Sequence, residues 1–98
     1  MAEDAAKVAP HAYKVLFENE QARVLEVSME PGARTEMHSH PDYYVYFLAD
    51  GKAKFTAPSG ETDEIEWPAG VGMWRAAEEH ATENTGATAI RALFFEPK

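Results

Sequence analysis

The sequence has no cysteine, few basic residues and no long apolar run, and each of these absences excludes a class of protein. Without cysteine, neither a disulfide framework nor a thiolate metal site is available, so a bound ion must rest on nitrogen and oxygen ligands. Nine basic residues are outnumbered by seventeen acidic ones, and a net charge of -8 would repel nucleic acid. No stretch approaches the roughly 18 apolar residues of a membrane span, and the first ten residues lack the apolar core of a signal peptide. We therefore expect a cytoplasmic protein with neither a nucleic-acid nor a membrane partner.

The composition that remains is that of one small globular domain. The chain has 98 residues, of which 45% are hydrophobic and 27% are charged. A domain of this length buries only about two thirds of the surface that its unfolded chain exposes, so a second copy would add stability. We assign residues 13–98 to the domain and residues 1–12 to an N-terminal segment that can fray, form a helical turn or lie along a partner subunit.

Short segments with strand-like composition alternate with turn residues, which predicts an all-β sandwich or barrel. The predicted strands are 13–17, 22–29, 35–40, 43–49, 52–57, 62–67, 71–75, 81–84 and 88–95. Asp50-Gly51 favours a tight hairpin between 43–49 and 52–57, because Asp-Gly accommodates positive φ. Apart from Arg91, segments 43–48 and 89–95 are apolar on both faces, so one face should fill the barrel while the other is covered. This pattern favours a homodimer.

Histidines are the residues best suited to bind an ion. His38 and His40 are two positions apart, so on an extended strand they share a face, with Cβ atoms about 6.5 Å apart. His80 returns later in the chain, four residues before Asn84. Neutral imidazoles suit zinc, iron, nickel, copper or cobalt, and three of them on rigid strands leave coordination positions open. Open positions point to chemistry or ligand capture and not to a purely structural ion.

The order of these histidines and two glycines resembles the cupin family. Gly32, five residues, His38-Ser39-His40 and the closing Gly51 match the first cupin motif, and His80 to Asn84 matches the end of the second. The resemblance runs from about residue 22 to residue 95. It implies a small double-sheet β-barrel of jelly-roll type that holds a metal ion inside.

By this resemblance, His38, His40 and His80 take three of the family's four ligand positions. Counting back from Gly51 places the fourth, normally a glutamate, at Tyr44. A phenol with pKa near 10 is a poor ligand for a divalent ion. Without the carboxylate the site should bind hard ions such as manganese less well and attract an anionic substrate.

Two further residues are candidates for catalysis. Tyr44 is expected to point into the barrel together with Tyr46, where Tyr44 either packs in the core or donates a hydrogen bond to a substrate. Glu36 lies two residues before His38 and should share its face. It either replaces the absent carboxylate, on the ion or through a histidine, or is a solvated residue at the rim.

These observations favour a metal-dependent enzyme of dioxygenase or isomerase type that acts on a small polar or anionic molecule. Its cofactor would be one divalent transition metal ion, from the set iron, zinc, nickel, manganese, cobalt and copper. Two alternatives stay open. One is a non-catalytic cupin that binds a small ligand, and the other is a metal-free enzyme with a histidine base and Tyr44 as donor.

Overall fold

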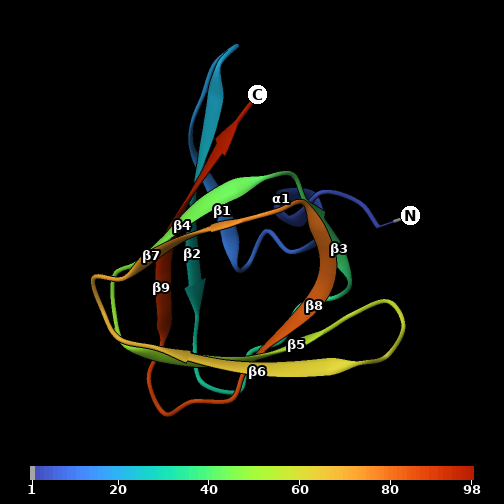
Figure 1. The fold of residues 1–98 in the computed structure, drawn as a ribbon, viewed down its shortest axis with the longest axis vertical. Helices are drawn as coiled ribbons and strands as arrows, with labels where there is room; N and C mark the ends of the chain where they lie inside the picture. The colour runs from blue at the N-terminus through green and yellow to red at the C-terminus, as the bar shows by residue number, and fades with distance from the viewer. Residues whose placement is uncertain (1) are drawn as a thin grey trace.

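The computed structural model describes residues 2–98 as two antiparallel sheets that face each other and form a barrel (Figure 1). The five-stranded sheet has the order β1-β2-β9-β4-β7, and the four-stranded sheet has the order β3-β8-β5-β6. The strands are β1 (Tyr13–Glu18), β2 (Ala22–Met29), β3 (His38–His40), β4 (Tyr43–Phe47), β5 (Gly51–Thr56), β6 (Thr62–Trp67), β7 (Gly72–Arg75), β8 (Glu78–Asn84) and β9 (Ile90–Pro97). The all-β, double-sheet fold predicted from the sequence is confirmed.

Two predicted strands differ in extent in ways that matter for the site. The segment predicted as 35–40 becomes a strand only at His38, because the chain bends at Met37. The segment predicted as 81–84 already begins at Glu78, so the strand gains three residues, of which Glu78 and His80 share one face. Both changes alter which side chains lie beside the histidines.

The hairpin predicted at Asp50-Gly51 is wrong. Strand β4 pairs with β7 and β9, whereas β5 pairs with β6 and β8, so the chain passes from one sheet to the other at this point. The Asp50 carboxylate accepts a hydrogen bond from the Ala69 amide at 2.7 Å, and the Trp67 ring lies so close to Gly51 that a Cβ atom there would be 2.6 Å from it. The dipeptide therefore makes a packed corner between the sheets instead of a hairpin turn.

Side chains from both sheets meet in an aromatic and aliphatic core. Phe47 and Trp67 stack at a ring distance of 4.2 Å, and the Trp67 indole donates a hydrogen bond to the Ala49 carbonyl at 3.2 Å. Tyr43 and Phe94 stack at 4.4 Å nearer the histidines. A buried tryptophan needs a partner for its N–H group, and the corner carbonyl provides it.

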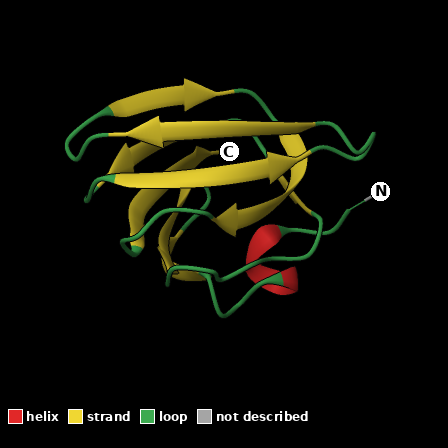
Figure 2. Cartoon of the chain, turned by 90° about the horizontal axis from the view of Figure 1, so that it is seen from below, coloured by secondary structure: helices red, strands yellow, loops and turns green. Residues whose placement is uncertain are grey.

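Of the three alternatives for the N-terminal segment, the structure has the helical turn. Helix α1 (Ala5–Val8) lies against the barrel, and Ala5, Ala9 and Ala12 are buried (Figure 2). Arg23 of β2 donates to the Asp4 carboxylate at 2.6 and 3.0 Å and also to the buried Glu96 at 2.6 Å. Within residues 2–98, no helix is long and apolar enough to span a membrane.

Two of the motif residues hold the turns around the site. Asn84 is almost fully buried. Its side-chain amide donates to the carbonyls of Met29 and Thr88 at 3.0 and 2.9 Å, and its side-chain oxygen accepts from the Gly86 amide. Gly32 has a φ of +83°, a conformation that side chains disfavour, and its amide donates to the Asn84 carbonyl. These two residues fix the turns between strands and do not contact the histidine rings.

Candidate metal centre

Strands β3 and β8 bring His38, His40 and His80 together inside the barrel. His38 and His80 are register partners, and His40 follows His38 on the same face of β3. Their exposed fractions are 0%, 3% and 4%, and the three ring centroids are 4.8 to 5.0 Å apart. One potential donor nitrogen from each ring lies within 4.8 Å of the others. The convergence predicted from the sequence spacing is confirmed.

The hydrogen bonds of these rings leave nitrogens free to face an ion. His38 Nδ1 donates to the Glu36 carbonyl at 2.8 Å, which assigns the proton to that nitrogen and leaves a lone pair on Nε2. Neither ring nitrogen of His40 or His80 has a hydrogen-bond partner within residues 2–98. Buried polar atoms without partners cost about 1–3 kcal/mol each, and native proteins contain few of them. His38 Nε2 has the Tyr13 hydroxyl at 3.3 Å, so only His40 and His80 are without partners in this part of the chain. Three imidazoles whose donor nitrogens converge fit a divalent transition metal.

Burial keeps two of the rings neutral. It lowers the pKa of His38 to about 4, although the hydrogen bond to Glu36 opposes the shift. Burial and the neighbouring His80 lower the pKa of His40 still further. Both rings are therefore deprotonated at neutral pH, the state in which imidazole binds a metal.

A carboxylate lies beside the histidines, contributed by a strand other than the one that the family motif uses. Glu78 pairs with His40 in register and shares the inward face of β8 with His80, whose Nδ1 is 3.6 Å from Glu78 Oε1. Glu78 accepts hydrogen bonds from the Tyr43 hydroxyl at 2.6 Å and from Arg75 at 2.8 and 3.2 Å. Burial alone would raise the pKa of Glu78, but the contacts with His80, Arg75 and Tyr43 hold it well below its usual range.

Known structures share this arrangement of strands. A cupin domain from Bordetella pertussis superposes with a TM-score of 0.79 and 28% identity, over 88% of this chain and 91% of the other. The chain belongs to the cupin superfamily. An RmlC-like cupin from Methanocaldococcus jannaschii superposes with a TM-score of 0.67 and 10% identity, over 88% of this chain and 78% of its own. The polyketide cyclase RemF from Streptomyces resistomycificus superposes with a TM-score of 0.62 and 21% identity, over 87% of this chain and 63% of its own. No protein-family model and no curated protein matches the sequence.

The inward orientation predicted for Tyr44 in this cupin is wrong. Burial along β4 alternates so that Tyr43, Val45 and Phe47 face the interior, while Tyr44 and Tyr46 are 41% and 38% exposed. The Tyr44 ring takes the space on the outer face where a side chain at Gly72 would lie. A count from Gly51 therefore finds the right strand but the wrong face. The catalytic role predicted for Tyr44 depended on that face and has no support from its position.

The position predicted for Glu36 is also wrong, although the residue does contribute to the site. The bend at Met37 interrupts the alternation, so Thr35 is buried and the Glu36 side chain is exposed. The backbone carbonyl of Glu36, and not its carboxylate, accepts the proton of His38. Any residue type at position 36 can supply that carbonyl.

Three residues of the site are missed by sequence reasoning: Tyr13, Tyr43 and Glu78. The Tyr13 hydroxyl is 3.3 Å from His38 Nε2, and burial raises the pKa of Tyr13. Burial and Glu78 raise the pKa of Tyr43. Both phenols therefore stay protonated. Had β8 been predicted to start at Glu78, its spacing of two from His80 would have placed this carboxylate on the histidines' face.

Proposed function

We propose that this cupin is a metal-dependent enzyme in which His38, His40 and His80 hold one divalent transition metal ion. The observation that supports this proposal is the convergence of three buried rings, two of which have no hydrogen-bond partner on either nitrogen within residues 2–98. Such a donor set selects among iron, zinc, nickel, cobalt and copper, and it suits manganese less well. When bound, the ion supplies Lewis acidity for a small polar substrate or, if it is iron, redox chemistry of dioxygenase type.

The surrounding residues orient the ligands and provide hydrogen-bond donors. The Glu36 carbonyl holds the tautomer of His38, and Glu78 lies next to Nδ1 of His80. A hydrogen-bonded partner such as this carbonyl fixes ring orientation and raises ligand basicity, whereas Glu78, at 3.6 Å, acts on His80 through its charge. Tyr13 and Tyr43 remain protonated, so their hydroxyls act as hydrogen-bond donors and not as bases. We assign to Tyr13, beside His38, the donor role that the sequence suggested for Tyr44.

Glu78 also replaces the charge that the usual motif glutamate would provide. Its carboxylate is closer to the histidines than any charge at position 44, because the side chain of that residue lies outside the barrel. Arg75 and Tyr43 hold Glu78 in place through three hydrogen bonds. A negative charge near the ion offsets part of its positive charge, so the site is less cationic than the sequence suggested.

Metal analysis of the purified protein tests this proposal. After expression with added iron, zinc, nickel or cobalt, we expect about one ion per chain and a higher melting temperature than in the chelator-treated protein. His38→Ala and His80→Ala should remove both effects, whereas His11→Ala, an exposed histidine, should keep them. If the wild-type protein holds no stoichiometric metal and gains no stability from any of these ions, the proposal fails.

One observation favours the metal-free alternative enough to keep it as a second candidate. The Tyr13 hydroxyl and His38 Nε2 are within hydrogen-bond distance in the interior, as a histidine base and a tyrosine donor would be. This candidate predicts full activity in the presence of a strong chelator. A cupin that only binds a ligand predicts binding without turnover. The cytoplasmic location expected from the sequence stays a prediction.

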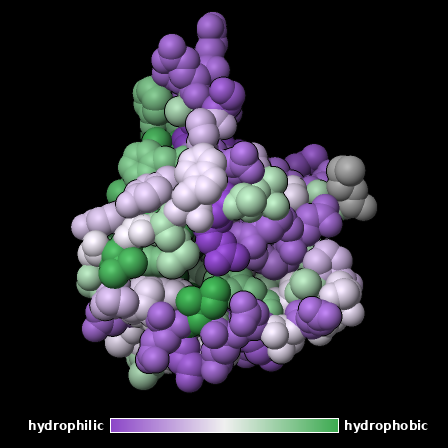
Figure 3. All heavy atoms as spheres, viewed as in Figure 1, coloured by the Kyte–Doolittle hydropathy of each residue, from purple (hydrophilic) through white to green (hydrophobic). Residues whose placement is uncertain are grey.

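We also propose that two copies associate through the outer face of the five-stranded sheet. The strand registers align one apolar side chain from each strand in a row across it: Trp74, Tyr44, Phe95, Val24 and Phe17. In Figure 3, hydrophobic side chains gather next to the hydrophilic tip of the hairpin formed by β1 and β2. Five exposed aromatics on these strands, Phe17, Tyr44, Tyr46, Trp74 and Phe95, are 38% to 57% exposed. At about 200 Å² per aromatic side chain they offer on the order of 450 Å².

That area is about half of the roughly 800 Å² per partner that a standard interface buries. Leu48 and Val71 add exposed apolar surface next to the row. Analytical ultracentrifugation should give twice the monomer mass for the wild type. Trp74→Glu should give the monomer mass, while Glu64→Gln on the other sheet should not change the mass. A monomeric wild-type protein at high micromolar concentration would exclude this dimer.

A further inference from the structure

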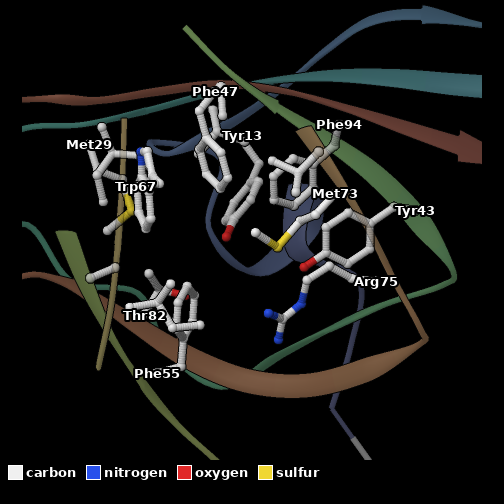
Figure 4. A pocket seen from close by; sticks show the side chains of 16 residues that line it. Tyr13, Met29, Tyr43, Phe47, Phe55, Trp67, Met73, Arg75, Thr82 and Phe94 are labelled. Carbon is white, nitrogen blue, oxygen red and sulfur yellow. The ribbon is translucent and has the colours of Figure 1, made fainter. Parts of the chain in front are cut away.

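The interior of the barrel contains a cavity of about 50 Å³ beside the histidine cluster. Its walls are almost entirely apolar and include Met29, Phe47, Trp67 and Met73 (Figure 4). A cavity of this size receives a group of only a few non-hydrogen atoms, since a cavity that binds benzene has about 150 Å³. The enclosed part of a ligand would therefore be short and apolar.

One polar group in this wall has no partner. Thr82 is 5% exposed and lines the cavity, and its hydroxyl has no hydrogen-bond partner within residues 2–98. It lies two residues after His80 on the inward face of β8. The Tyr13 hydroxyl also lines the cavity and contacts His38. Thr82 also acts on the Tyr13 hydroxyl, so these two groups lie close together. A ligand oxygen that reaches the Thr82 hydroxyl would therefore lie next to Tyr13, which contacts His38.

The surface next to this cavity is acidic. A surface groove of about 380 Å³ shares Phe55, Ile65 and Arg75 with the cavity and also reaches His80. Four carboxylates line the groove: Glu61, Asp63, Glu78 and Glu79. Its one cation, Arg75, already donates two hydrogen bonds to Glu78. A molecule that carries a carboxylate or phosphate would meet unbalanced negative charge at this surface.

The geometry points to an uncharged ligand with a short apolar end and a carbonyl or hydroxyl oxygen, which accepts or donates a hydrogen bond at Thr82. This inference rests on the proposed function, because it assigns the substrate class of the same site. It differs from the sequence-based expectation of an anionic substrate, for which the missing motif carboxylate was the reason. The carboxylates of the groove, with Glu78 among them, reverse that expectation.

Two probes of matched size test the inference: 2-butanone, which is neutral, and butanoate, which is anionic. Each is titrated into ¹⁵N-labelled protein while amide shifts are recorded, with and without zinc. We expect saturable shifts in β5, β8 and β9 around the cavity with butanone and none with butanoate at neutral pH. Butanoate shifts of similar affinity, or no saturable shift with butanone, would overturn the inference.

Variants at position 82 separate the hydroxyl from the shape of the cavity. Thr82→Val keeps the shape and removes the hydroxyl, and should weaken butanone binding about three- to tenfold, as loss of one hydrogen bond does. Thr82→Ser should retain most of the affinity. Equal butanone affinity in the valine variant would overturn the role of Thr82. Melting curves check that both variants fold. The Thr82 carbonyl accepts from the Thr35 amide and the Thr82 amide donates to the Thr35 hydroxyl, and neither hydrogen bond involves the exchanged group.

The zinc-free arm distinguishes failure of this inference from failure of the proposed function. Butanone binding that depends on Thr82 in a protein that takes up no metal would support the ligand class and exclude the metalloenzyme. Stoichiometric metal without butanone binding would support the metal site and exclude the ligand class.

Discussion

The two ends of the barrel interior differ in how completely their side chains satisfy one another. At the apolar end, Phe47 and Trp67 stack, and the one polar atom of the tryptophan has its partner in the Ala49 carbonyl. At the histidine end, four ring nitrogens of His40 and His80 have no partner within residues 2–98. The polar atom at the apolar end is therefore paired, whereas the polar atoms at the histidine end are ones that a bound ligand would satisfy. The two ends nevertheless share one interior, because Phe47 and Trp67 also line the cavity that reaches Tyr13 and Tyr43 beside the histidines.

The largest expected effect is at the apolar end. Trp67→Ala should lower the free energy of unfolding by about 3–5 kcal/mol, because it removes a buried indole and leaves a cavity beside Phe47. Urea denaturation measures this loss. The folded fraction should retain its metal affinity, since Trp67 does not contact the histidines. A variant that loses metal affinity as well as stability would show that the two ends are coupled.

The histidine end should make the metal-free protein sensitive to acid. Burial lowers the pKa of His38 to about 4 and that of His40 further, so between pH 6.5 and about 4 the unfolded chain binds protons that the folded chain does not. Stability is therefore lost as the pH falls, by up to about 1.4 kcal/mol per pH unit for each histidine. Glu78, whose pKa is lowered, adds a loss of the same sign below about pH 4.5. Chelator-treated protein, unfolded in urea across this range, gives the slope.

The slope also distinguishes the two ends. Trp67→Ala should lower the whole stability curve with little change in its pH dependence. A flat curve between pH 6.5 and 4.5 in the wild-type protein would mean that the histidines are not buried and neutral.

Replacing a ligand with an apolar side chain should stabilise the metal-free protein. His40→Leu removes two buried nitrogens without partners, which cost about 1–3 kcal/mol each, and part of this cost should be recovered. The same variant should lose the rise in melting temperature that metal produces in the wild type. Thermal unfolding with chelator and with zinc measures both quantities. If the variant is less stable than the wild-type protein under chelator, the His40 nitrogens do not carry the cost of unpaired buried polar atoms.

The smallest effect is expected for a pair of neighbouring tyrosines on opposite faces of β4. Tyr43→Phe removes one hydrogen bond from Glu78 and should weaken metal binding about tenfold, the effect typical of an indirect partner. Tyr44→Phe removes an exposed hydroxyl and should change neither metal affinity nor stability by more than about 0.5 kcal/mol. Isothermal titration with zinc compares the two. A larger effect at position 44 would restore the role that the sequence suggested.

Sequence reasoning succeeded where local spacing determines geometry. His38 and His40 share a face because strands have a period of two, and the order of Gly32, Gly51, His80 and Asn84 identified the fold. It failed where tertiary packing chooses between local options. Asp50-Gly51 suits a hairpin, yet contacts with Trp67 and Ala69 make it a corner between sheets.

For a similar reason, the sequence does not predict which face of β4 points into the barrel. Either face of Tyr43 to Leu48 is apolar enough to be buried, so the sequence does not distinguish them. Contacts made from distant strands decide the matter: Tyr43 reaches Glu78 and stacks on Phe94, while Tyr44 packs over Gly72. The bend at Met37, which turns Glu36 outward, likewise leaves no mark in the composition of 35–40.

The strand that carries two of the three candidate ligands depends on the chain terminus. Strand β3 has three residues and pairs with β8 along one edge. Along its other edge, the Ser39 amide donates to the Glu3 carbonyl at 2.7 Å, and the Arg23 side chain holds Asp4 in place. A change outside the barrel, such as an added N-terminal tag or cleavage before Ala5, would therefore reach His38 and His40 through the backbone. If the site binds metal as proposed, its affinity would change with the state of residues 3 and 4.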